Sequence, residues 1–360
     1  MIRFIPLGGF LGAGKTTTML AAAKILESRG ERVSLVTNDQ GSDLVDTQLA
    51  KESGLAGIGE VTGGCFCCRF DDLAEVVIRL TEQVNPTIVI AEAVGSCTDL
   101  QSTVVKPLRR LYGDALRTGP LTVTVDPVRL RALDTLTKRL GVEPDLAYLF
   151  RHQLDEADII GVNKIDLLSA PVLSALTDDL SARFPHARIV TYSAATGTSL
   201  NELIASWGTA VSEHDAFDID YDRYAHAEAE LAWTNQTFTL TGRGFSALEW
   251  AKVLLEHLGA AIAAEDAAIG HIKLRVAAAD GAVKASLTQA GAAPTFDQHH
   301  GGPLSEATVT FNARVQLGTA ELDAMITAAV AAADAACATA SGPRTGDIFH
   351  PSYPTPVHRM

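Results

Sequence analysis

The chain has 360 residues, 47% of them hydrophobic and 20% charged, with a formal net charge of -14 at pH 7. This length and balance are typical of a globular protein of two or three domains with a sizeable core. The negative charge argues against nucleic acid or an anionic membrane as a partner, because both select a basic protein face. Small anionic ligands are compatible with it, since a few backbone N–H groups can bind a phosphate.

The first two hundred residues alternate short apolar runs, rich in Val and Ile, with helical patterns. Such runs are typical of strands buried on both faces, and the alternation predicts an α/β domain with a mainly parallel sheet flanked by helices. Strands are expected at 2–7, 33–37, 87–91, 121–125, 159–163 and 189–192. Helices are expected between them, at 16–29, 71–83 and 171–184 among others.

The segment GGFLGAGKTT follows the first predicted strand and leads into a predicted helix. From Gly9 to Thr16 it matches the phosphate-loop pattern G-x-x-x-x-G-K-[ST]. The glycines let backbone N–H groups face phosphate oxygens, Lys15 adds a charge near the β- and γ-phosphates, and Thr16 offers a hydroxyl to Mg²⁺. The predicted nucleotide contacts in this segment are Gly9, Gly12, Ala13, Gly14, Lys15, Thr16 and Thr17.

Three cysteines lie within four positions in GGCFCC, at Cys65, Cys67 and Cys68. A disulfide between neighbouring cysteines is strained, whereas thiolates held close together suit Zn²⁺ or another soft metal. Three cysteines leave one tetrahedral position for another ligand or a partner. A second interpretation stays open, in which the three cysteines pack as small buried hydrophobic side chains.

Other features of the sequence favour a cytoplasmic, reducing environment. The N-terminal residues MIRFIPLGG lack the long apolar core and cleavage site of a signal peptide, and no stretch reaches the length of a membrane span. The five cysteines are an odd number and form no disulfide framework. We therefore expect the thiols of GGCFCC to be free or metal-bound.

Two further segments predict the rest of a guanine nucleotide site. In TIVIAEAVG, Glu92 stands at a strand end, where it can hold Mg²⁺ through water, and the Gly95 amide can reach the γ-phosphate. In NKID, the Asp166 carboxylate can accept hydrogen bonds from N1–H and the exocyclic amine of guanine, which adenine does not offer. The predicted base contacts are Asn163, Lys164 and Asp166, with Ser193 and Ala194 after the next strand.

The composition changes near residue 211, and four segments are expected: a P-loop GTPase domain at 1–210, an acidic linker at 211–229, a smaller α+β domain at 230–341 and a Pro-rich tail at 342–360. Strict alternation in ATVTFNARVQL predicts a half-exposed antiparallel sheet in the smaller domain. HIKLRV and VKASL are expected to form a hairpin that turns at Asp280 and Gly281, and a helix is expected at 319–339. The tail is expected to be extended or disordered.

In their order and spacing, GGFLGAGKTT, GGCFCC, EAVG and NKID resemble the CobW-like P-loop GTPases, a metal-handling family that includes CobW of cobalamin biosynthesis, nitrile hydratase activators and zinc-regulated metallochaperones. The resemblance covers the first two hundred residues. It implies slow hydrolysis of GTP to GDP and phosphate, coupled to the binding and transfer of Zn²⁺, or of Co²⁺ or Ni²⁺. It implies that Cys65, Cys67 and Cys68 hold this metal, that Thr16 binds Mg²⁺, and that Lys15, Glu92 and Asp39 are the catalytic residues.

The sequence departs from the family pattern at the second strand. Relatives carry Asn-Glu-x-Gly-Glu, whereas this chain reads TNDQGSD, so that a non-cysteine metal ligand is left open among Asp39, Asp43 and Glu60. The chain lacks a long His-rich tract and has His299 and His300 in DQHHGG, which are either solvated or part of a metal relay.

The expected mechanism is a two-state switch, in which Mg·GTP orders the segments 38–68 and 92–98 and hydrolysis releases them. The expected partner is a client metalloprotein or cofactor enzyme, and a homodimer is compatible with the sequence. Three alternatives stay open: a GTPase chaperone for a cofactor-dependent enzyme with structural thiols, a passive metal-buffering module, and an adenine-specific ATPase or kinase.

Overall fold

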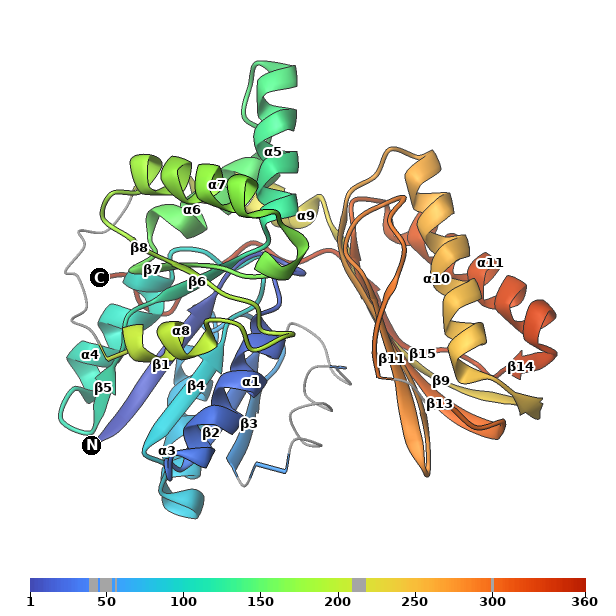
Figure 1. Cartoon of the computed structure of the whole chain (residues 1–360), viewed down its shortest axis with the longest axis horizontal. Helices are drawn as coiled ribbons and strands as arrows, with labels where there is room; N and C mark the ends of the chain where they lie inside the picture. Colours follow the sequence, from blue (N-terminus) through green and yellow to red (C-terminus); the bar gives the residue numbers. More distant parts are fainter. Residues whose placement is uncertain (39–44, 46–53, 56, 209–217, 299–300) are drawn as a thin grey trace. The chain divides into compact units, whose positions relative to one another are not determined.

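The computed structural model describes residues 1–38, 45, 54–55, 57–208, 218–298 and 301–360, which form two compact units (Figure 1). The first unit contains the described residues within 1–40, 49–227 and 353–360, and the second those within 41–48 and 228–352. Val45 therefore belongs to the second unit, where its N–H donates to Asn312 Oδ1 at 2.9 Å.

The first unit is built on a parallel sheet, as the sequence predicts. In the described part of the chain its strand order is β3-β2-β4-β1-β6-β7-β8, and β5 lies beside β1. The six predicted strands are confirmed within one or two residues, whereas β3 and β5 were not predicted. The strands are β1 (Ile2–Gly8), β2 (Val33–Asn38), β3 (Gly57–Val61), β4 (Ile88–Glu92), β5 (Leu116–Thr118), β6 (Thr122–Val125), β7 (Ile159–Val162) and β8 (Arg188–Thr191).

Helices cover this sheet. Met19 and Leu26 of α1 share one apolar core with Leu203 of α8 and with Ile5 and Ile90 of the sheet, so α1 and α8 lie on the same face (Figure 1). The predicted helices at 16–29, 71–83 and 171–184 are confirmed as α1, α3 and α7. The described helices and helical turns are α1 (Lys15–Ser28), α3 (Phe70–Val84), η1 (Gln101–Val105), α4 (Lys106–Tyr112), α5 (Pro127–Leu140), α6 (Asp145–Asp155), η2 (Ile165–Leu167), α7 (Ala170–Arg183), α8 (Leu200–Ser206) and α9 (Tyr221–Ala229).

The second unit is an antiparallel sheet with two helices, in agreement with the predicted α+β class. Its described strand order is β12-β11-β10-β13-β9-β14, with β15 beside β9, and α10 and α11 pack on one face (Figure 1). The elements are β9 (Ala232–Phe245), α10 (Ala247–Ala264), β10 (Ile269–Ala278), β11 (Gly281–Leu287), β12 (Thr295–Gln298), β13 (Leu304–Val315), α11 (Thr319–Cys337), β14 (Thr339–Ser341) and β15 (Thr345–Phe349).

Two details of the second unit differ from the sequence predictions. The hairpin forms, but Ala278 pairs with Gly281, so its turn consists of Ala279 and Asp280 and not of Asp280 and Gly281. The prediction of a half-exposed sheet is wrong for part of β13, because Thr310, Asn312 and Arg314 on its polar face are buried. Strict alternation identified the apolar face correctly but could not show that the polar face is also covered.

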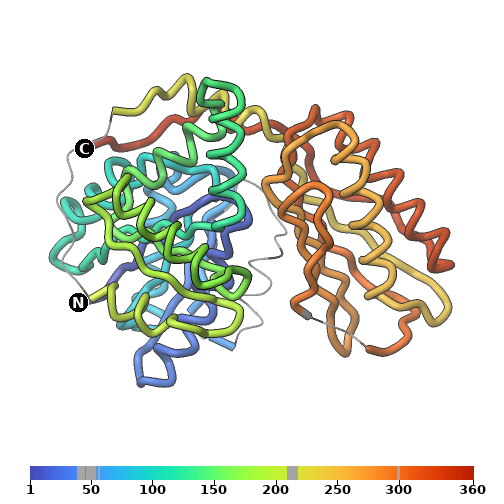
Figure 2. Tube along the Cα trace, turned by 45° about the horizontal axis from the view of Figure 1, so that its top comes forward, coloured from blue at the N-terminus to red at the C-terminus, as the bar shows by residue number. Residues whose placement is uncertain are grey.

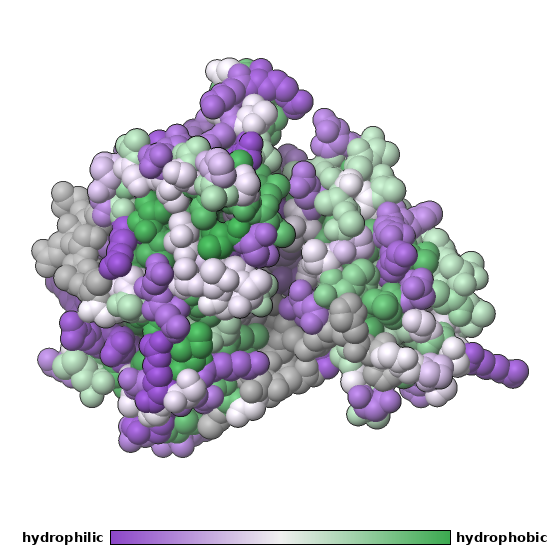
Figure 3. All heavy atoms as spheres, viewed as in Figure 1, coloured by the Kyte–Doolittle hydropathy of each residue, from purple (hydrophilic) through white to green (hydrophobic). Residues whose placement is uncertain are grey.

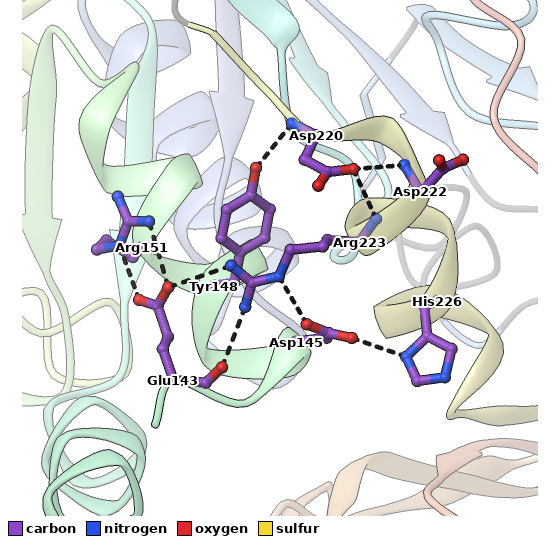
Figure 4. A network of polar contacts seen from close by, with 8 residues as sticks. All are labelled: Glu143, Asp145, Tyr148, Arg151, Asp220, Asp222, Arg223 and His226. Atoms are coloured by element: carbon purple, nitrogen blue, oxygen red, sulfur yellow. Dashed lines mark hydrogen bonds and ion pairs between the residues drawn. The ribbon is translucent and has the colours of Figure 1, made fainter. Parts of the chain in front are cut away.

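The acidic segment after residue 217 is helical and folds onto the first unit (Figure 4). The Arg223 guanidinium of α9 lies 3.9 Å from the centroid of the Tyr148 ring, and its Nε donates to Asp145 Oδ1 at 2.8 Å. The backbone N–H of Asp220 donates to the Tyr148 hydroxyl at 2.8 Å, and His226 Nδ1 lies 2.8 Å from Asp145 Oδ2. Burial opposes ionisation of Asp145, yet Arg223 and His226 lower its pKa below the ordinary value. These charges therefore pair within the unit, so this part of the predicted linker is an ordered helix.

The segment predicted as a Pro-rich tail is also ordered where the structure describes it. Its first part contains β15, which pairs with β9. Residues 353–360 have no regular secondary structure and belong to the first unit, where the trace in Figure 2 carries the last residues along that unit. Part of this segment is extended as predicted, but its packing was not foreseen.

The described helices are too short or too polar to cross a lipid bilayer. In the face shown in Figure 3, hydrophilic and hydrophobic residues are interspersed over both units, and the tip of α5 is hydrophilic. The charged side chains Arg131, Lys138 and Arg139 contribute to the polarity of that helix.

Candidate nucleotide and metal site

The predicted phosphate loop lies between β1 and α1 and is curled against the sheet. Gly9 has a φ of 124° and Gly14 a φ of 91°, in the left-handed region that favours glycine. A Cβ on Gly9 would lie 2.3 Å from the Thr124 carbonyl oxygen in β6, and one on Gly14 would lie 2.5 Å from Asn163 Nδ2. The backbone can therefore follow this path only with glycine at these two positions. A glycine-rich loop that leads into a helix can present its N–H groups to an anion.

Two side chains at the start of α1 suit phosphate and Mg²⁺. Lys15 is buried, and its ammonium donates to the carbonyl oxygens of Gly9 at 2.7 Å and Phe10 at 3.2 Å. Thr16 Oγ1 donates to Glu92 Oε1 at 3.0 Å, because β1 and β4 are neighbours in the sheet. A hydroxyl beside a carboxylate is an oxygen donor set that fits Mg²⁺. Thr17, also predicted as a contact, points to the exposed side of the helix.

The NKID segment is bonded directly to the phosphate loop. Asn163 Nδ2 donates to the Ala13 carbonyl at 2.9 Å, while its Oδ1 accepts from the Ala194 backbone N–H at 2.9 Å. Lys164 Nζ donates to the Gly12 carbonyl at 2.8 Å. Asp166 lies in η2, just after β7, with an exposed side chain. The structure thus brings the predicted base and phosphate residues together, and Asp166 has room to meet a ligand.

Two further residues shape this region: Asp126, which the sequence did not predict, and Ser193, which was predicted as a base contact. Asp126 Oδ2 forms an ion pair with Lys164 Nζ at 2.6 Å, and its Oδ1 accepts from the Val128 N–H at 2.8 Å to cap α5. The Asp-Pro pair that opens α5 is a typical helix start and was a usable signal. Ser193 is fully buried, and its N–H donates to the Thr198 carbonyl at 2.9 Å, so it shapes the turn beside Ala194.

The loop after β4 lies against the phosphate loop. A Cβ on Gly95 would come within 2.6 Å of Leu11 Cδ2 and 2.9 Å of the Leu11 backbone nitrogen, so the two loops are in close contact. Gln153 of α6 holds this loop, because its Nε2 donates to the carbonyl oxygens of Gly95 at 3.0 Å and Cys97 at 2.9 Å. Nothing in the local sequence around Gln153 indicated this contact.

The three predicted metal-binding thiols form one cluster. Among the residues that the structure describes, the Sγ atoms of Cys65, Cys67 and Cys68 lie within 4.8 Å of one another. Cys65 Sγ is 2.7 Å from Cys67 Sγ and 3.3 Å from Cys68 Sγ, and the last two are 3.8 Å apart. All three cysteines are free. Three thiols gathered in one place are a donor set that suits Zn²⁺ or another soft metal.

The Asn38 side chain holds the backbone of the loop that carries the three thiols. Asn38 at the end of β2 donates from Nδ2 to the Val61 carbonyl at 3.0 Å and the Gly64 carbonyl at 2.8 Å, and its Oδ1 accepts from the Phe66 N–H at 2.9 Å. The amide side chain thereby fixes the loop that carries the three cysteines. Hydrogen bonds from neighbouring thiols, Cys65 first, together with burial, raise the pKa of Cys67 well above its ordinary value. A bound metal would therefore have to displace a proton from Cys67.

Residues 353–360 lie against this cluster. The Thr355 N–H donates to Cys68 Sγ at 3.2 Å, and the Val357 N–H donates to the Cys67 carbonyl at 2.9 Å. Arg359 Nε forms an ion pair with buried Asp99 Oδ2 at 2.8 Å. An amide that donates to a ligand sulfur helps to orient and tune that ligand.

Several predicted residues lie outside the described part of the chain: Asp39, Asp43, His299 and His300. Glu60, the third candidate for a non-cysteine ligand, lies in β3 and is not part of the described thiol cluster.

A buried carboxylic acid stands behind the loop that follows β4. Glu156 Oε1 accepts from Thr98 Oγ1 at 3.1 Å, and its Oε2 accepts from the Gln101 N–H at 2.9 Å. Burial, and to a smaller degree the nearby charge of Asp99, raise the pKa of Glu156 to about 8. The folded protein therefore retains a proton on Glu156 at pH values where the unfolded chain has released it.

We expect Glu156 to make the protein less stable as the pH rises from about 4.5 to about 8, by a few kcal/mol in total. Below this window both states are protonated, so Glu156→Gln should leave the free energy of unfolding nearly unchanged near pH 4.5. Near pH 8 the variant should be the more stable protein, because glutamine has no charge to bury. Urea unfolding at the two pH values measures this, with exposed Glu202→Gln of α8 as control. A variant as pH-dependent as the parent would contradict the shifted pKa.

Comparison with known proteins agrees with this combination of loops. A curated relative named "Zinc chaperone CobW" from Sinorhizobium sp is 31% identical over 193 residues, covering 49% of this chain and 54% of the relative. A protein of the same name from Pseudomonas aeruginosa is 26% identical over 208 residues, covering 50% of this chain and 53% of the relative. The chain thus spans about half the length of the curated relatives it matches.

Among solved structures, the Zn(II)-bound YjiA GTPase from E. coli is 15% identical, with a TM-score of 0.37, and the match covers 91% of this chain and 98% of that one. HypB from Helicobacter pylori in complex with nickel is 14% identical, with a TM-score of 0.41, over 57% of this chain and 84% of that one. Residues 4–191, more than half of the chain, match the family model for the CobW/HypB/UreG nucleotide-binding domain. The chain therefore belongs to the CobW/HypB/UreG family of nucleotide-binding proteins.

Proposed function

We propose that this protein is a GTP-hydrolysing metallochaperone that couples its nucleotide state to the binding and transfer of a transition metal, in the first place Zn²⁺. The observation that carries the proposal is the cluster of three thiols in the same unit as a complete phosphate loop. Asn38, at the end of a strand of the nucleotide-binding sheet, holds the cysteine loop through three hydrogen bonds. A nucleotide-dependent shift of this strand end would therefore reach the thiols directly.

In this proposal the nucleotide is held at both ends. The phosphate loop and Lys15 bind the phosphates, Thr16 and Glu92 hold Mg²⁺, and Gly95 reports the γ-phosphate. Asp166 selects guanine, while Asn163 and Lys164 keep the base and phosphate segments together. The backbone around Gly9, Gly12, Ala13, Gly14, Thr17, Ser193 and Ala194 completes the contacts. The proposed catalytic residues are Lys15, Glu92 and Asp39, the last outside the described residues.

The choice of metal rests on donor chemistry and on relatives. Thiolates favour Zn²⁺, with Co²⁺ and Ni²⁺ as further candidates. The two curated relatives are named zinc chaperones, which supports zinc as the cargo. Transfer implies a client, and we propose a metalloprotein or a cofactor-dependent enzyme in that role.

The proposal requires a reciprocal link between the two ligands. If GTP changes the affinity for Zn²⁺ by some factor, Zn²⁺ must change the affinity for GTP by the same factor, commonly about 5- to 150-fold. Titration calorimetry with a non-hydrolysable GTP analogue, with and without Zn²⁺, measures this factor. An unchanged nucleotide affinity would remove the coupling from the proposal.

Replacing Cys65, Cys67 and Cys68 together by serine should abolish tight binding of one Zn²⁺ and remove any effect of Zn²⁺ on GTP affinity or turnover. The same variant should bind GTP normally, because none of the three side chains touches the phosphate loop in the contacts described above. Cys337→Ser, in the second unit, is the matched control. Elemental analysis, chelator competition and phosphate release provide the measurements.

The outcomes separate the proposal from its competitors. Unaltered metal content in the triple variant would favour structural thiols, an interpretation that the burial of Cys65 and Cys67 supports. Metal binding without GTP turnover under any metal condition would favour a passive metal buffer. Equal binding of ATP and GTP in competition would contradict guanine selection.

A further inference from the structure

A fourth cysteine lies beside the thiol cluster. Cys97, in the loop that follows β4, is fully buried, and its Sγ lies 3.7 Å from Cys67 Sγ. Its position in the chain does not link it to the other three, since the nearest of them, Cys68, lies 29 positions earlier. In the folded chain the two loops meet, because Cys67 stands just before α3 and Cys97 just after β4.

Two of the sulfur-to-sulfur distances match the spacing in a four-sulfur metal site. With Zn–S bonds of about 2.3 Å, the sulfurs of a tetrahedral site lie about 3.8 Å apart. Cys67 Sγ lies at 3.7 Å from Cys97 and 3.8 Å from Cys68, so it already has two neighbours at this spacing. Cys65 stands closer, at 2.7 Å from Cys67, and would have to move outward as a metal entered.

Two side chains must move to complete the site. The sulfurs that lie within 4.8 Å of one another are those of Cys65, Cys67 and Cys68, so Cys97 Sγ is farther than that from at least one of them. The backbone of its loop is firmly placed, because Gln153 donates to the Cys97 carbonyl at 2.9 Å and the Cys97 N–H donates to the Val94 carbonyl at 3.0 Å. A rotation of the Cys97 side chain, with an outward shift of Cys65, is therefore the change that metal binding requires.

We propose that Cys97 is the fourth ligand of the transition metal, which would then be held by four sulfurs from two loops. This inference rests on the proposed function, since it concerns the same metal. The three cysteines leave one tetrahedral position of the metal open, and Cys97 would fill it with a ligand from the same chain. It also attaches the metal to the loop of Gly95, which packs on Leu11 of the phosphate loop. Metal and γ-phosphate would then act on one loop, two residues apart.

The test uses Co²⁺ as a spectroscopic probe in the reduced, full-length protein. The sulfur-to-Co²⁺ charge-transfer absorption scales with the number of thiolate ligands. Cys97→Ser and Cys97→Ala should each lower it by about a quarter and should weaken Zn²⁺ binding, measured by chelator competition, on the order of 100-fold. Cys337→Ser should leave both measurements unchanged. Two variants are used because serine keeps the size of the side chain, whereas alanine avoids burying a hydroxyl.

The outcomes distinguish this inference from the proposed function. A wild-type protein that binds one Co²⁺ with an absorption unaltered in both folded Cys97 variants would overturn the assignment of Cys97 and leave the three-thiol chaperone standing. A wild-type protein that takes up neither Co²⁺ nor Zn²⁺ would overturn the proposed function, and the four-sulfur site with it. A fall in absorption in the Cys97 variants but not in Cys337→Ser supports the inference.

Discussion

Replacement of Asp166 by asparagine should weaken GTP binding by about 100- to 10,000-fold and should raise the affinity for xanthosine triphosphate. In the proposed site the Asp166 carboxylate accepts two hydrogen bonds, from N1–H and from the exocyclic amine of guanine. Asparagine would meet that amine with its own N–H₂ group, so two donors would face each other. Xanthine carries a carbonyl oxygen in place of the amine, which the asparagine N–H₂ can satisfy.

The structure favours a specific effect of this variant on the ligand. The Asp166 side chain is exposed in the short turn η2, and Asn163 and Lys164 supply the contacts that hold this turn to the phosphate loop. The fold should therefore tolerate the change. Competition between the two nucleotides and ATP for a fluorescent guanine nucleotide measures the preference, with exposed Asp178→Asn of α7 as control. Equal losses for both nucleotides would contradict a direct contact between Asp166 and the base.

The nucleotide site was predictable because each of its parts follows a strand. Short apolar runs fixed the positions of β1, β4, β7 and β8, and polar motifs stand directly after them in the chain. In a parallel sheet the carboxyl ends of the strands meet at one edge, so local sequence was sufficient to bring Thr16 near Glu92 and Asn163 near Ala13. Local sequence did not predict β3 and β5, because neither contains a short apolar run. β3 reads GIGEV, in which two glycines weaken the strand signal.

The metal end of the site was less predictable, because its contacts join distant parts of the chain. Asn38 and Phe66 are 28 positions apart, Cys67 and Cys97 are 30 apart, and Thr355 reaches Cys68 across 287 positions. No periodicity or turn signal encodes contacts of this kind. The Pro-rich composition around Thr355 indicated a lack of regular structure, which is correct, but composition does not reveal where an extended segment packs. The same limit applies to α9, whose Arg223 and His226 find their acidic partner, Asp145, on α6.

Replacement of Lys15 by alanine should weaken GTP binding by about 100- to 1,000-fold, through loss of charge-assisted hydrogen bonds to two phosphates. The Lys15 ammonium now donates to the carbonyl oxygens of Gly9 and Phe10, so it must leave these oxygens as the phosphates arrive. The loop does not depend on this side chain alone, since Gly9 packs on Thr124 and Ala13 is bonded to Asn163. The variant should therefore fold, and Lys24→Ala, exposed on the same helix, is the control.

The two variants should weaken contacts to different parts of the nucleotide. Comparing them tests the assignment of the phosphate-binding residue and of the base-binding residue separately. Lys15→Ala removes a contact to phosphate, so its affinity for guanosine without phosphates should equal that of the parent protein, while its affinity for GTP falls. Asp166→Asn removes a contact to the base, so it should weaken guanosine and GTP by the same factor. Both should retain Zn²⁺ with the affinity of the nucleotide-free parent, because neither side chain belongs to the thiol cluster. Calorimetry with guanosine, GDP and GTP decides the matter, and a loss of guanosine binding in Lys15→Ala would show that the loop itself had collapsed.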